Sequence, residues 1–233
     1  MSAPDQGAGA VEEDKKVFFV SLGCPKNRVD SEIMLGELDR NRYQMVQSAE
    51  EADVLVVNTC GFVEEAREES VDTIVELAEH KTASGGAKKL VVAGCLTQRY
   101  ADELERELPE VDVFMGTGEP QKIAELLGQS LPTGPRKPLS LVGRPGYNHD
   151  AYSPRIRTTD PWMAYVKIAE GCSQRCAFCI IPRLRGGQKS RTAEDVITEV
   201  RSLAAAGVQE INLIAQDLTH FGDDLKDGTS LAG

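Results

Sequence analysis

Four runs of apolar, largely β-branched residues in the first half of the chain alternate with stretches that have helical spacing. The runs are Val17–Gly23, Asp53–Thr59, Lys89–Gly94 and Val111–Met115. Strands that are apolar along their whole length are typical of parallel sheets, because helices cover both faces of such sheets. We predict these helices at residues 27–40, 63–78, up to 108, and 121–127, with a short strand at 43–47. The first half is therefore predicted to be α/β, with a doubly wound parallel sheet.

Prolines mark a change of character at residues 131–161, which hold six of the eleven prolines in the chain. Proline fixes φ and lacks a donor, so a linker or irregular connection is expected there. A second βα series follows, with strands at 163–169 and 209–215 and a helix at 192–206 that Thr192 could cap. We predict a disordered leader at 1–15, an N-terminal domain at 16–130, a Pro-rich linker at 131–161 and a second domain at 162–233.

The composition favours a cytoplasmic protein. The first sixteen residues lack the basic start and apolar run of a secretory signal, and no run is long enough to span a membrane. In a reducing compartment, six cysteines are better explained by metal ligation or catalysis than by disulfides. Residues 1–130 carry 26 acidic and 13 basic residues, whereas residues 131–191 carry 11 basic and 3 acidic. The acidic part would favour a basic partner and oppose a long nucleic-acid footprint.

Three of the cysteines, called here the loop cysteines, form a compact motif. Cys172, Cys176 and Cys179 have the spacing C-x3-C-x2-C. One short loop can bring such thiolates to a single iron–sulfur cluster, and three ligands leave one iron of a cubane open. Zinc usually takes four ligands in two pairs, and no fourth lies near. The motif follows the first strand of the second βα series, where βα barrels build active sites. The alternative is three unligated buried thiols.

The other three cysteines, called here the strand-end cysteines, each follow a predicted strand of the first half. Cys24 follows VFFVSLG, Cys60 follows DVLVVNT and Cys95 follows KLVVAG. The carboxyl ends of parallel strands share one edge of a sheet, where doubly wound folds bind ligands. Each cysteine alone could be an ordinary small buried residue. Together they predict a second three-thiolate cluster.

The words SLGCPKNRVDSE, VVNTCGFVEEAREES, VVAGC, EGCSQRCAFCIIPRLRG and AQDLTHFG resemble the methylthiotransferases, a family of radical S-adenosylmethionine (SAM) enzymes. The resemblance implies that residues 16–130 are a UPF-type methylthiotransferase domain. Residues 162–233 would be the first part of a radical SAM βα (TIM-like) barrel, incomplete in this chain. LGCPKN and AQDLTHFG look like the branch that modifies an aspartate of ribosomal protein S-twelve. The tRNA-modifying branch reads closer to FGCQMN and GQNVNSYG.

The resemblance also implies the cofactors, which are two 4Fe–4S clusters and SAM. The loop cysteines would hold the cluster that binds and cleaves SAM to give a 5′-deoxyadenosyl radical. The strand-end cysteines would hold the cluster that keeps or donates the sulfur. Phe178 would lie near the adenine of SAM, and Gln216 would contact SAM. The radical would take a hydrogen from the β-carbon of the aspartate, and a second SAM would supply the methyl group.

The expected partners are ribosomal protein S-twelve as substrate and a small electron donor such as a flavodoxin or ferredoxin. The chain would be a truncated product, weakly active or inactive alone, and direct nucleic-acid binding is not expected of it. Alternatives are a tRNA adenosine methylthiotransferase, a non-catalytic iron–sulfur module and a zinc-binding interaction protein. No Ser/His/Asp arrangement is visible. The histidines, His80, His149 and His220, are interpreted as surface or loop residues.

Overall fold

The computed structural model describes residues 15–84, 88–129 and 138–232. The predicted leader lies outside these residues apart from Lys15, which begins the first strand. Prolines 132 and 135 of the predicted linker also lie outside them. The domain boundaries predicted from the sequence stay a prediction.

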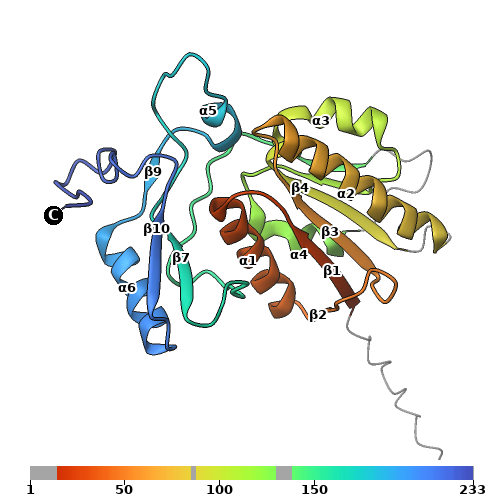
Figure 1. The fold of residues 1–233 in the computed structure, drawn as a ribbon, viewed down its shortest axis with the longest axis horizontal. Helices are drawn as coiled ribbons and strands as arrows, with labels where there is room; N and C mark the ends of the chain where they lie inside the picture. Colours follow the sequence, from red (N-terminus) through yellow and green to blue (C-terminus); the bar gives the residue numbers. More distant parts are fainter. Residues whose placement is uncertain (1–14, 85–87, 130–137, 233) are drawn as a thin grey trace, which may run out of the picture.

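The first part of the chain forms a six-stranded sheet in which every neighbouring pair is parallel (Figure 1). The spatial order is β2-β1-β3-β4-β5-β6. The strands are β1 (Lys15–Ser21), β2 (Tyr43–Met45), β3 (Val54–Thr59), β4 (Lys89–Gly94), β5 (Val113–Met115) and β6 (Leu139–Leu141). The helices are α1 (Pro25–Arg40), α2 (Glu64–Ala83), α3 (Cys95–Glu107), the short 3-10 helix η1 (Pro120–Lys122) and α4 (Ile123–Gly128).

Helices cover both faces of this sheet because its central strands are apolar on both sides. Val54 and Val56 of β3 pack with α1 and α4 on one face. Leu55 and Val57 of the same strand pack with α2 and α3 on the other. All six residues of β3 are buried. The predicted doubly wound α/β architecture of this part is confirmed.

Two element predictions in this part need correction. Helix α2 runs to Ala83 instead of ending at residue 78. The region interpreted as an irregular connection contains a strand, β6, which pairs with β5. Leu139 and Leu141 pack against the core and Ser140 is exposed, so three residues are enough to extend the sheet. Proline 138 lies just outside this strand and costs it no hydrogen bond.

The second part contains β7 (Met163–Lys167), β8 (Ala169–Glu170), α5 (Ile181–Arg185), β9 (Lys189–Ser190), α6 (Ala193–Ala205) and β10 (Glu210–Ile214). Strands β7 and β10 pair in parallel, and α6 packs against them. The single strand predicted at 163–169 is broken at Ile168, because β8 leaves β7 to pair antiparallel with β9. Thr192 caps α6, as predicted, by accepting a hydrogen bond from the Asp195 N–H. Within the described residues, no helix is long and apolar enough to cross a membrane.

The segment before β7 joins the two parts through buried ion pairs. Arg155 pairs with Glu32 of α1 at 2.6 Å and with Glu199 of α6 at 2.7 Å. Glu199 also pairs with Arg191, whose guanidinium lies 3.0 Å from the His149 ring. His149 was predicted to be a surface or loop residue. It lies in a loop but is 3% exposed.

Candidate cluster sites and the junction between them

The three strand-end cysteines follow three strands that are adjacent in the sheet. Cys24 comes after β1, Cys60 after β3 and Cys95 after β4, and these strands lie side by side in that order. The register pairs Ser21 with Asn58, and Thr59 with Gly94, so the strands end at nearly the same level. The structure therefore brings all three cysteines to one edge of the sheet.

The backbones around these cysteines pack directly against one another. A Cβ atom placed on Gly23 would lie 2.9 Å from Cβ and 3.3 Å from Sγ of Cys60. A Cβ atom on Gly61 would lie 2.8 Å from the carbonyl oxygen of Cys95. The lack of side chains at these two positions is what allows the three strand ends to approach so closely.

An asparagine side chain ties two of the strand ends together. The buried Asn27 amide, in the first turn of α1, donates to the carbonyl oxygen of Leu22 at 2.7 Å and to that of Thr59 at 3.2 Å. These carbonyls lie just after β1 and at the end of β3, where no further strand pairing can satisfy them. Asn27 is part of the word LGCPKN, so the residues after Cys24 help to fix its position.

The three loop cysteines lie on a segment without regular structure between β8 and α5. Cys172 is buried, Cys179 is partly buried and Cys176 is exposed. The N–H of Cys172 donates to the carbonyl of Gly186 at 3.1 Å, and the N–H of Cys179 donates to the carbonyl of Cys176 at 3.1 Å. The first bond ties the start of the loop to the residue after α5, and the second forms a turn within the loop.

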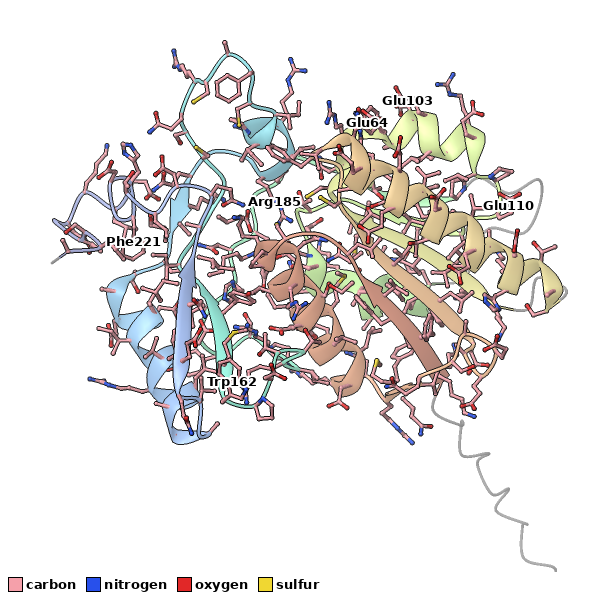
Figure 2. The ribbon with its side chains drawn as sticks, viewed as in Figure 1. Glu64, Glu103, Glu110, Trp162, Arg185 and Phe221 are labelled. Atoms are coloured by element: carbon pink, nitrogen blue, oxygen red, sulfur yellow. The ribbon has the colours of Figure 1, made fainter. Side chains whose placement is uncertain are left out.

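A short connection links the loop cysteines to the strand-end cysteines. Helix α5 begins two residues after Cys179 and ends at Arg185, and it packs against α3, the helix that begins with Cys95. Arg185 Nη2 donates to Sγ of Cys95 at 3.3 Å and to Oδ1 of Asn27 at 3.1 Å. Figure 2 shows Arg185 between the sheet of the first part and the strands of the second.

Arg185 belongs to a fully buried group of four charged side chains. Lys167 of β7 binds Asp30 and Glu170, each at 2.6 Å. Arg185 pairs with Asp30 and lies 3.5 Å from Glu170. Two positive and two negative charges therefore face one another, which offsets the large cost of removing each from water.

The neighbouring opposite charges favour the charged forms of Asp30 and Lys167. Burial by itself would raise the pKa of Asp30, but Arg185 and Lys167 hold it below its usual value. Burial would likewise lower the pKa of Lys167, and Asp30 with Glu170 raises it instead. Burial raises the pKa of the Cys95 thiol, and the charge of Arg185 opposes this effect.

The two residues predicted to bind SAM have different surroundings. Gln216, just after β10, donates to Oε1 of Glu170 at 2.9 Å. Its own Oε1 is buried and has no hydrogen-bond partner among the described residues. A buried orphan acceptor fits a residue that completes its bonds with a bound polar ligand. Phe178 is 93% exposed between two loop cysteines, and its role stays a prediction.

The donor sets of both cysteine groups fit iron–sulfur clusters. All six cysteines are free thiols. Within residues 15–84, 88–129 and 138–232, no three His, Cys, Asp or Glu side chains form a group that could hold a metal ion. A cubane asks for a different arrangement, because each thiolate binds a separate iron. The assignment of the six cysteines as ligands stays a prediction.

Sequence reasoning missed the charged residues at the junction, including Asp30, Lys167, Glu170 and Arg185. Two of them stand in the word EGCSQRCAFCIIPRLRG, in which Glu170 is the first residue and Arg185 the last but one. Their closeness to the motif was the signal available in the sequence. Their partner Asp30 lies 155 residues before Arg185, and nothing in the sequence connects the two.

Comparison with known proteins matches two separate parts of the chain to known families. Residues 16–116 match the family described as uncharacterized protein family UPF0004, and residues 166–227 match the radical SAM superfamily. A curated relative from Pelobacter propionicus, named ribosomal protein uS12 methylthiotransferase RimO, is 49% identical over 219 residues. That alignment covers 94% of this chain and 48% of the relative. A relative of the same name from Myxococcus xanthus is 53% identical, over 91% of this chain and 43% of its own length.

The resemblance to the methylthiotransferases is confirmed. The chain spans about half the length of the curated relatives that it matches. Among solved structures, it is similar to the radical S-adenosylmethionine methyltransferase TsrM from Kitasatospora setae, with a TM-score of 0.55 and 13% identity. The match covers 88% of this chain and 48% of TsrM. At this identity, the likeness concerns the fold alone.

Proposed function

We propose that this chain is part of a radical SAM methylthiotransferase of the RimO type, which adds a methylthio group to the β-carbon of an aspartate in ribosomal protein uS12. One observation carries the proposal. Three cysteines follow three adjacent parallel strands, and the helix that starts at one of them packs on the segment that follows the loop cysteines. Relatives about half identical in sequence bear the corresponding name.

Two 4Fe–4S clusters and SAM, when bound, would supply the electron, the carbon-centred radical and the sulfur for this reaction. The chain's own residues hold and orient them. The loop cysteines would hold one cluster, and the strand-end cysteines the other. Gln216 offers its buried acceptor to SAM, while Glu170 fixes the orientation of the Gln216 amide. Holding both groups near one substrate carbon is the orientation effect on which such steps depend.

The charge of the chain supports a basic protein substrate. Residues 1–130 hold twice as many acidic as basic residues. Helix α2, for example, has exposed glutamates along its outer face. Such a surface steers a basic protein toward the molecule and repels a nucleic-acid backbone. A small flavodoxin- or ferredoxin-like electron donor and a cytoplasmic location are further parts of this proposal.

Counting iron and sulfide after anaerobic reconstitution tests the cluster assignment. We expect about eight of each per chain for the unsubstituted protein, since two cubanes contain eight. A variant in which Cys172, Cys176 and Cys179 are all replaced by Ala should retain about four iron and four sulfide ions per chain. Replacing Cys24, Cys60 and Cys95 with Ala should also leave about four. An unchanged iron content in either triple variant would overturn that half of the assignment.

The reaction itself is tested by supplying the protein with SAM and a reductant. Deoxyadenosine should form, and formation should cease when the three loop cysteines are replaced with Ala. Incubation with uS12 should add the mass of a methylthio group in place of one hydrogen on an aspartate. Modification of tRNA adenosine and not of uS12 would instead assign the chain to the tRNA branch, and no SAM cleavage would indicate a non-catalytic iron–sulfur module.

A further inference from the structure

One buried arginine contacts a strand-end cysteine from the other half of the molecule. Arg185 is 3% exposed, and its Nη2 lies 3.3 Å from Sγ of Cys95. It reaches this sulfur from α5, which belongs to the segment after the loop cysteines. Within the part of the chain that the structure describes, no other hydrogen bond joins a charged side chain to a cysteine sulfur.

The guanidinium of Arg185 is held in place by one hydrogen-bonded carboxylate, one amide oxygen and a second nearby carboxylate. Asp30 binds its Nη1, and the Asn27 amide oxygen accepts from Nη2 at 3.1 Å. Glu170 lies 3.5 Å from Nη1. Arginine presents its donors in a rigid planar fork, so bonds that fix Nη1 also fix the direction of Nη2. The donor that faces Cys95 is therefore preorganised.

We propose that Arg185 is a positioning residue that raises the reduction potential of the cluster on the strand-end cysteines, by donating a hydrogen bond to the Cys95 sulfur. The inference rests on the proposal that Cys24, Cys60 and Cys95 hold a cluster. Reduction adds negative charge to the iron and sulfur atoms, and a fixed cationic donor stabilises the more negative state. Hydrogen bonds to the ligand sulfurs are one of the factors that set such potentials.

The same residue ties the two cysteine groups to one another. Helix α5 follows the loop cysteines in the chain, and Arg185 at its end donates a hydrogen bond to Cys95, the first residue of α3. Asp30 and Asn27 of α1 also accept hydrogen bonds from Arg185. A change at Arg185 should therefore be detected at Cys95, which lies 90 residues earlier in the chain.

The test isolates the strand-end cluster without removing any segment of the chain. In a parent variant with Cys172, Cys176 and Cys179 replaced by Ala, about four irons should remain after anaerobic reconstitution. Its midpoint potential is then measured by redox titration monitored by electron paramagnetic resonance. Two substitutions are added to this parent. Arg185→Met keeps the bulk and removes all donors, and Arg185→Lys keeps the charge beside Asp30 but loses the fork.

Arg155→Met is the matched control, because Arg155 is also buried and also pairs with a carboxylate of α1, but contacts no cysteine. We expect a more negative midpoint potential for Arg185→Met and Arg185→Lys than for the parent, and an unchanged potential for Arg155→Met.

Each result decides between clear alternatives. Equal potentials in the parent and in both Arg185 variants would overturn the inference, as would an equal shift in the Arg155→Met control. If Arg185→Met takes up no iron, the Arg185→Lys variant decides. If the parent itself binds no iron, the cluster proposal fails and this inference falls with it.

Discussion

At the scale of single residues, two glycines set the backbone conformation between a strand and the cysteine that follows it. Gly94 has φ of +100° immediately before Cys95, and Gly171 has φ of +73° immediately before Cys172. Both values lie in the region where residues with a Cβ are strained. A Cβ on Gly94 would also lie 2.4 Å from Oδ1 of Asn58. These two positions thus fix the direction of one cysteine in each group.

The Gly94→Ala substitution should therefore destabilise the protein by at least about 2 kcal/mol, because it combines backbone strain with a clash against a buried amide. Denaturant unfolding followed by circular dichroism measures this change. Gly128→Ala serves as the control, since a Cβ there meets nothing within 4 Å at the end of α4. We expect Gly128→Ala to be neutral or slightly stabilising. Equal stability of both variants would refute the argument.

The strand-end cysteines could be predicted from the sequence because their positions follow from a rule about strands. Any residue just after a buried parallel strand lies at the ligand-binding edge. The junction charges could not be predicted in this way. Lys167 and Asp30 bind each other across 137 residues, and neither has a local pattern that reveals the partner. The burial of His149 in its loop could not be predicted for the same reason, since its neighbours Arg191 and Glu199 lie more than forty residues later in the chain.

At the scale of elements, the cap of α6 was predicted from the sequence. Thr192 accepts from the Asp195 N–H at 3.2 Å, which satisfies one of the donors left free at a helix start. Acidic residues Glu194 and Asp195 occupy the first turn, where they favour the helix dipole. Helix α6 covers β7 and β10, so its stability supports the small second sheet.

Thr192→Ala should cost about 1 kcal/mol, the usual penalty for losing an N-cap hydroxyl. Thr198→Ala provides the comparison within the same helix, because the Thr198 hydroxyl bonds only the preceding turn at Glu194. We expect a change below about 0.5 kcal/mol for that variant. Thermal unfolding of both proteins gives the difference, and a larger loss at position 198 would contradict the role of the cap.

Elements that depend on distant pairing were harder to predict. Strand β6 has three residues in a proline-rich region, and it exists because β5 offers it an unpaired edge. The break at Ile168 arises because β9, about twenty residues later, pairs with β8. Neither the strand β6 nor the break at Ile168 is marked in the sequence by a hydrophobic period or a capping residue. The long strands β1, β3 and β4 and the capped helix α6, by contrast, were predicted close to their observed bounds.

At the scale of the whole molecule, Glu199 links the second part to the segment that reaches α1. Burial by itself would raise the pKa of Glu199, but hydrogen bonding and charge from His149 and Arg191 lower it to about 2, from a usual value of 4.5. Since the pKa is lower in the folded state, the stabilisation is complete above about pH 4.5. It is lost as the pH falls toward 2.

The Glu199→Gln variant should be less stable than the parent at neutral pH, by at most about 3 kcal/mol, the free energy that corresponds to the whole pKa difference. The gap between the two proteins should shrink as the pH falls from 4.5 to 2. Urea unfolding over this pH range measures it. Glu194→Gln, exposed on the same helix, should change stability by less than about 0.5 kcal/mol. A gap that stays constant with pH would show that Glu199 does not act through its charge.

The short course of the chain from Cys179 to Arg185 has a consequence for which sequence changes the protein can tolerate. Cys179 is the last of the loop cysteines, and Arg185, six residues later, donates a hydrogen bond to the strand-end cysteine Cys95. This stretch acts as a spacer of fixed length. A residue inserted or deleted within it would rotate α5 by about 100°, which would turn the guanidinium away from its sulfur. Changes in length are better tolerated in exposed turns far from this spacer, such as the one after α6.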